Sequence, residues 1–216
     1  FRRLWLAGFC ANIARWMDLL VLGWVALKLT GSPFMVGVAA FSRVAPMMIL
    51  GPVVGIIAER AHRGHLLIAS QSLGIVASAA LTTIFATGHG SFGRLVSLQV
   101  VLGVVWAVDF TVRRSVVYTL VGPARLASAI SLDTVSMQLA KMLGPLAGGV
   151  LLAWTGAPGS YGLVALLYAM SLVFLMRLQG AVSAPTRVTE SMARGLAECL
   201  RRARAGEADE ILGLDG

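Results

Sequence analysis

The sequence predicts an all-α membrane protein that crosses the bilayer six times. Of its 216 residues, 57% are hydrophobic and 13% are charged, whereas a soluble domain has about 25% charged residues. The apolar residues gather in six blocks, most of them near the roughly 20 residues that a helix needs to cross the hydrocarbon core. Basic residues collect in the gaps on one side of these blocks, which is typical of multi-pass proteins.

The expected helices cover residues 4–29, 34–58, 66–87, 95–117, 126–154 and 161–178. Each block is continuously apolar, without the alternation that strands of a membrane barrel show. The first gap contains Ser32 and Pro33, which read as a helix cap followed by a proline at the first helical position. Turn-forming residues also separate later helices, at 88–91, 122–123 and 156–159.

Arginines in the gaps predict the orientation. One side of the membrane carries Arg2, Arg3, Arg60, Arg63, Arg113, Arg114, Arg125, Arg177 and Arg187. The other side carries Lys28 and Arg94, both at helix ends. By the positive-inside rule, the N-terminus and the tail are expected in the cytoplasm.

The composition divides the chain into two regions, a six-helix bundle over residues 1–178 and a cytoplasmic linker over 179–216. Met192, Leu196 and Leu200 recur at intervals of four, which predicts a short amphipathic helix on the inner membrane surface. A linker that is partly disordered is the alternative. Because the chain starts with Phe1 rather than methionine, we expect a piece of a longer protein.

Several function classes are not favoured. The net charge of +8 suggests nucleic-acid binding, but the basic residues form no continuous face with interleaved aromatics. Cys10 and Cys199 lie in different regions and are too few for a metal site, and no nucleotide-binding loop is present. We therefore expect no catalytic residue, no metal, no cofactor and no nucleic-acid partner, and the protein is not expected to be an enzyme.

A short pattern occurs twice, 93 residues apart, as Leu50-Gly51-Pro52-Val53-Val54-Gly55 and Leu143-Gly144-Pro145-Leu146-Ala147-Gly148. The same offset brings the first helix close to the fourth and the third onto the sixth. Because three helices are an odd number, the second unit enters from the opposite side, so the pattern predicts an inverted three-plus-three repeat. Coincidence is the alternative, because glycine, proline and leucine are common in membrane helices.

The gap after the second helix resembles the signature loop of the major facilitator superfamily, G-x-x-x-D-R-x-G-R-[KR]. Gly55, Arg60 and Arg63 match this loop, Glu59 replaces its aspartate, and His62 and Gly64 depart from it. Gly144, Pro145, Gly148 and Gly149 resemble the G-P-x-x-G motif of exporters in this superfamily, and residues 120–126 are similar to the macrolide-efflux and enterobactin-exporter subgroup. The resemblance implies the N-terminal half of a major facilitator fold, in the inner membrane of a bacterium.

Polar residues inside the apolar blocks are the candidates for a substrate or ion pathway, because each is costly in lipid. Arg15 and Asp18 lie three apart and can neutralise each other, either as a substrate- or proton-sensing pair or as a packing device. Asn12 extends the same face. Arg43 has no acid nearby in the sequence, so Asp133 is its candidate partner, and Lys141 lies too deep to reach the membrane surface comfortably.

The resemblance also implies a cytoplasmic gate in which Asp109 joins Glu59, Arg60, Arg63 and Arg113, next to Gly55. Many proton-coupled exporters of this type carry an arginine four residues before a glycine of the fourth helix, but this chain has Gln99 before Gly103. The motif Gly144, Pro145, Gly148 and Gly149 is expected to pack helices closely rather than to bind a ligand.

The expected function is a secondary transporter that exports small amphipathic molecules, of drug or siderophore type, by alternating access and with ion coupling. Its expected partners are a small-molecule substrate, membrane lipid, and either a C-terminal six-helix half or a second copy. The alternative is a truncated six-helix scaffold or dimerising module that transports nothing itself.

Overall fold

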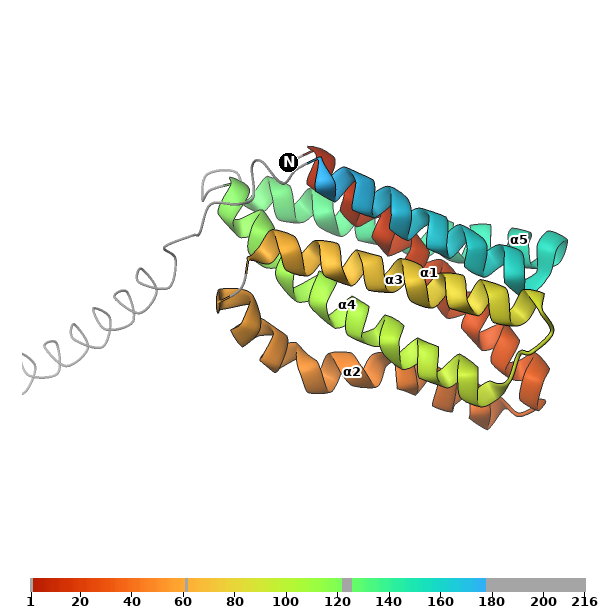
Figure 1. The fold of residues 1–216 in the computed structure, drawn as a ribbon. Coiled ribbons are helices and arrows are strands. Elements are labelled where there is room, and N and C mark those ends of the chain that lie inside the picture. The colour runs from red at the N-terminus through yellow and green to blue at the C-terminus, as the bar shows by residue number, and fades with distance from the viewer. Residues whose placement is uncertain (1, 61, 122–125, 178–216) are drawn as a thin grey trace, which may run out of the picture. The chain divides into compact units, whose positions relative to one another are not determined.

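The computed structural model describes residues 2–60, 62–121 and 126–177. They form five helical elements: α1 (Arg2–Thr30), α2 (Pro33–Arg60), α3 (Arg63–Ala86), α4 (Phe92–Val121) and α5 (Leu126–Met176). The helices lie lengthwise against one another in a bundle, and the described residues contain no strand (Figure 1). The predicted all-α membrane fold is therefore confirmed, while the predicted linker helix after residue 178 lies outside the described residues.

α5 consists of two helices that fold back on each other. Its 51 residues would span about 76 Å as one straight helix, more than twice the hydrocarbon thickness. Gly156 interrupts it with a φ of 69° and a ψ of −164°, a conformation that favours glycine. Figure 1 shows α5 reversing its direction at the end of the bundle away from the N-terminus. We name residues 126–155 the outward arm and residues 157–176 the return arm, so the described residues contain six helical segments long enough to cross a membrane.

Small residues on α1 and α5 let these two helices pack closely. A Cβ atom added to Gly144 would lie 2.8 Å from the Met17 amide nitrogen, and one added to Gly148 would lie 3.1 Å from Met17 Cγ. On α1, Ala11 and Ala14 are fully buried. Gly149 and the glycines of the first copy of the pattern, Gly51 and Gly55, face open space instead. The two copies therefore pack differently, and the inverted repeat stays a prediction.

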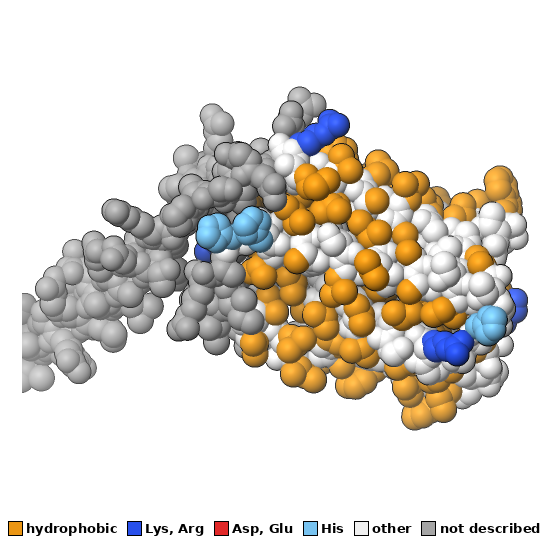
Figure 2. Space-filling view, in the orientation of Figure 1, with side chains coloured by type: hydrophobic (Ala, Val, Ile, Leu, Met, Phe, Trp, Pro, Cys, Tyr) orange, Lys and Arg blue, Asp and Glu red, His pale blue; other side chains and the backbone are white. Residues whose placement is uncertain are grey.

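The outside of the bundle is apolar. Figure 2 shows hydrophobic side chains over the middle of one face and basic side chains near its ends. Trp154, Phe34 and Met142 are 83%, 73% and 72% exposed. Exposed apolar surface of this extent is not stable against water, so the surrounding solvent of the bundle is lipid.

The substitution Gly144→Ala tests the close contact between α1 and α5. Its new methyl group would meet backbone atoms, which cannot rotate away, so we expect a loss of about 1–3 kcal/mol of stability. Gly149→Ala is the matched control because its methyl group enters open space. Thermal unfolding in detergent, followed by size-exclusion chromatography, measures both, and equal melting temperatures would contradict the packing described here.

Candidate functional site

In the part of the chain that the structure describes, five charged side chains are buried inside the bundle. They are Arg15 and Asp18 of α1, Arg43 of α2, and Asp109 and Arg113 of α4, and each is at most 7% exposed. A charge in a low-dielectric interior is stable only when it is paired and hydrogen-bonded. The five side chains meet this requirement in two separate clusters, each named below after its aspartate.

The Asp18 cluster joins α1, α2 and α4. The Arg43 guanidinium forms an ion pair with the Asp18 carboxylate, and it donates a hydrogen bond of 2.8 Å to Gln99 Oε1. Gln99 Nε2 donates in turn to Asp18 Oδ1 at 3.0 Å. The three side chains thus close a ring that contains one negative charge and one positive charge, so the cluster is neutral. The prediction that Asp133 is the partner of Arg43 is wrong.

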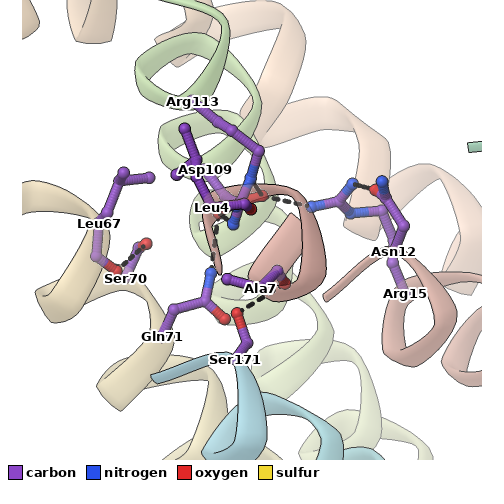
Figure 3. A network of polar contacts seen from close by, with 10 residues as sticks. All are labelled: Leu4, Ala7, Asn12, Arg15, Leu67, Ser70, Gln71, Asp109, Arg113 and Ser171. Atoms are coloured by element: carbon purple, nitrogen blue, oxygen red, sulfur yellow. Dashed lines mark hydrogen bonds and ion pairs between the residues drawn. The ribbon is translucent and has the colours of Figure 1, made fainter. Parts of the chain in front are cut away.

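The Asp109 cluster lies beside the start of α1, where Arg113 reaches Leu4 (Figure 3). Arg113 donates to Asp109 Oδ1 at 2.5 Å and to Oδ2 at 3.3 Å. Arg15 adds a bond of 3.1 Å to Oδ2, and Gln71 of α3 adds one of 2.8 Å to Oδ1. Two arginines thus share one carboxylate, which gives the cluster a formal charge of +1.

Further bonds extend the Asp109 cluster along α1. Arg15 Nη1 donates to Asn12 Oδ1 at 2.6 Å, and Arg113 Nη1 donates to the Leu4 carbonyl at 3.2 Å. Asn12 therefore lies beside Arg15, as the spacing predicts. The predicted pairing of Arg15 with Asp18 is wrong, because the two side chains project toward different neighbours. Arg15 reaches α4, while Asp18 meets the arginine of α2.

The remaining predicted site residues lie apart from the two clusters. Asp133 is partly exposed on the outward arm of α5, and Lys141 is exposed on the same arm, its Nζ 5.2 Å from the centre of the Trp16 ring. Arg63 begins α3. The side chains of Glu59 and Arg60 lie outside the described residues, so their place in a gate stays a prediction.

Two amides in the clusters were not identified as site residues from the sequence. Gln71 is fully buried, and its position as an uncharged polar residue inside an apolar block is the sequence signal that could have identified it. Gln99 carries no charge, yet its amide contacts both members of the ion pair. A buried amide can donate and accept at once, which suits it to bridge a carboxylate and a guanidinium.

The fold and the buried charges define the class of protein: a multi-pass helical membrane protein with paired charges in its interior, as transport proteins have. Residues 1–211 match the family described as transmembrane secretion effector, and the chain belongs to this family of the major facilitator superfamily. The resemblance seen in the signature loop is therefore confirmed.

Two curated relatives are transporters by name. The chain is 22% identical over 189 residues to the staphyloferrin A transporter of Staphylococcus aureus, a match that covers 87% of this chain and 47% of the relative. It is 25% identical over 204 residues to an uncharacterized MFS-type transporter of Sinorhizobium fredii, covering 91% and 49%. The chain therefore spans about half the length of the curated relatives it matches.

Replacing Asp109 tests whether the Asp109 cluster holds the bundle together. Asp109→Asn removes the charge that balances Arg15 and Arg113, and breaking a buried pair of this kind costs about 3–5 kcal/mol. We expect a sharp loss of folded protein, measured by size-exclusion chromatography of detergent extracts after heating. Asp133→Asn, at a partly exposed site of α5, is the control and should be as stable as the unchanged protein. If Asp109→Asn were as stable as this control, the Asp109 cluster would not contribute to the stability of the bundle.

Proposed function

We propose that this chain is part of a secondary transporter that exports small amphipathic molecules by alternating access, driven by an ion such as the proton. The observation that carries the proposal is the Asp18 cluster. Its carboxylate is completely buried and is balanced by one arginine and one neutral amide from two other helices. A charge balance this simple can be changed by a single proton.

Protonation of Asp18 would leave the Arg43 charge unbalanced in the interior. The ring through Gln99 ties α1 to α2 and to α4, so loss of the ion pair would weaken the contact between these helices. An element that is stable in one charge state and unstable in the other is what a conformational switch requires. Because Gln99 is neutral, the cation of the cluster comes from α2 rather than from α4.

The Asp109 cluster supports a second role, as part of a gate. It connects α1, α3 and α4 through one carboxylate. We propose that Glu59, Arg60 and Arg63 contribute to the same gate, next to Gly55, and that this end of the bundle faces the cytoplasm of a bacterial cell, as the distribution of arginines predicts. The alternating movement would make and break this network.

The relatives support transport as the function, and the length they share with this chain supports a second bundle. We propose that the substrate pathway forms between this bundle and a partner bundle, either a C-terminal half or a second copy. Asn12, Arg15, Asp133 and Lys141 remain proposed pathway residues beside Asp18 and Arg43. A scaffold without transport of its own is the second candidate, and a measured efflux decides between the two.

The test replaces the members of the ion pair in the protein at its natural length. Asp18→Asn and Arg43→Ala should each reduce efflux at least about tenfold without removing the protein from the membrane, because each abolishes the charge change that we propose drives transport. Efflux is measured in vesicles with an imposed pH gradient, against a panel of lipophilic cations, macrolides and siderophores.

A double variant separates coupling from folding. Asp18→Asn combined with Arg43→Gln leaves no unbalanced buried charge, so the protein should fold and insert normally. Efflux should nevertheless stay low and lose its dependence on the pH gradient. Full efflux by both single variants would exclude Asp18 and Arg43 from the mechanism, and the absence of efflux for every compound from the unchanged protein would favour the scaffold.

A further inference from the structure

An exposed polar stripe runs along the outward arm of α5. Its members recur at intervals of three and four and are all exposed: Ser131, Thr134, Gln138 and Lys141. The neighbouring exposed residues of this arm are apolar, among them Val135 at 54% and Met142 at 72%. A polar stripe on a helix that otherwise faces lipid marks a surface that meets water or a polar partner within the membrane.

Lys141 lies at the middle of the arm. It is 15 residues from the start of the arm and 14 from its last residue, which places it about 21–22 Å along the helix from either end. A lysine side chain cannot bring its ammonium group from the bilayer centre to an interface about 15 Å away. The charge therefore remains at the depth where alternating-access transporters bind their substrates.

The positive charge of Lys141 is not matched by an acid in the described part of the chain. The buried acids Asp18 and Asp109 pair with arginines, and the contact that Lys141 makes is with the Trp16 ring, 5.2 Å from its centre. A tryptophan face stabilises an ammonium group modestly, but it does not neutralise the charge. Lys141 thus retains an unused capacity to bind an anion.

An aromatic stripe of α1 lies directly beside the polar stripe. It consists of Trp5, Phe9 and Trp16, all half-buried, with Trp5 and Phe9 stacked at 5.6 Å. Trp5 Nε1 donates to the Leu132 carbonyl of α5 at 3.4 Å, and Trp16 contacts Lys141. The two helices therefore present an apolar aromatic surface and a cationic surface next to each other.

We propose that this surface binds an amphipathic anion, with a carboxylate of the substrate on Lys141 and its apolar body on Trp16 and Phe9. The inference rests on the proposed transport function and narrows its substrate class. A carboxylate at Lys141 gains an ion pair in a medium of low dielectric constant, whereas a lipophilic cation meets repulsion at the same place. Arg43 is paired with Asp18, and Arg15 shares Asp109 with Arg113. Lys141 contacts an aromatic ring rather than a carboxylate in the described part of the chain, so it is the group that would select the charge of the substrate.

The test compares two dyes that share a xanthene ring system, the anion fluorescein and the cation rhodamine 123. Their binding to the purified protein of natural length is measured in detergent by fluorescence anisotropy, which requires no transport. We expect the unchanged protein to bind fluorescein more tightly than rhodamine 123. Lys141→Gln should weaken fluorescein binding about tenfold without weakening rhodamine binding, and Lys141→Arg should retain fluorescein binding.

Lys28 provides the matched control. Its Nζ lies 4.7 Å from the centre of the Trp24 ring, in the last turn of α1, so Lys28→Gln removes the same kind of pair at the end of a helix. Fluorescein binding should not change in this variant.

Three outcomes would overturn the inference. The first is that the unchanged protein binds no fluorescein, the second is that Lys141→Gln binds fluorescein as tightly as the unchanged protein does, and the third is that Lys28→Gln weakens fluorescein binding as much as Lys141→Gln does. The transport proposal is judged separately, because pH-driven efflux that depends on Asp18 would survive each of these results.

Discussion

The balance of charge inside lipid is the constraint on which the rest of this structure depends. The described residues bury five charged side chains inside the bundle, where a low-dielectric interior makes an unpaired charge costly. Asp18 and Arg43 are held together with Gln99, and Asp109 is held by Arg15 and Arg113. Because members of each cluster come from different helices, the pairing also determines which helices lie in contact. The pairing of charges and the packing of helices therefore depend on each other in this protein.

The two clusters differ in a way that suits different tasks. The carboxylate of Asp109 accepts bonds from two arginines and one amide, so removal of any one donor leaves the others in place. Asp18 has a single cationic partner, so its state depends on one interaction. The Asp109 carboxylate therefore keeps partners when one bond breaks, while the Asp18 carboxylate would lose its cationic partner. The bundle thus combines a cluster with several bonds near the start of α1 and a cluster held by one ion pair and one amide further along α1.

Much of the fold could be predicted from the sequence, because hydrophobic block length and the position of arginines depend on local composition. The reversal at Gly156 was also expected, although the break proved tighter than the four-residue gap suggested. The partners of buried charges could not be predicted in the same way. Arg15 and Asp18 are close in sequence but pair with residues on other helices, and Arg43 pairs with Asp18 rather than Asp133. Such contacts depend on how the helices are rotated about their axes, which a single sequence does not specify.

The near absence of a loop at Gly156 has a mechanical consequence. The return arm starts at once after the outward arm, so neither arm can slide along the membrane normal without pulling the other. Ser171 on the return arm bonds to the Ala7 carbonyl at 2.9 Å, and Gly144 on the outward arm lies against α1. The hairpin therefore contacts α1 through both arms, so we expect a tilt of α1 to displace both arms together rather than one of them alone.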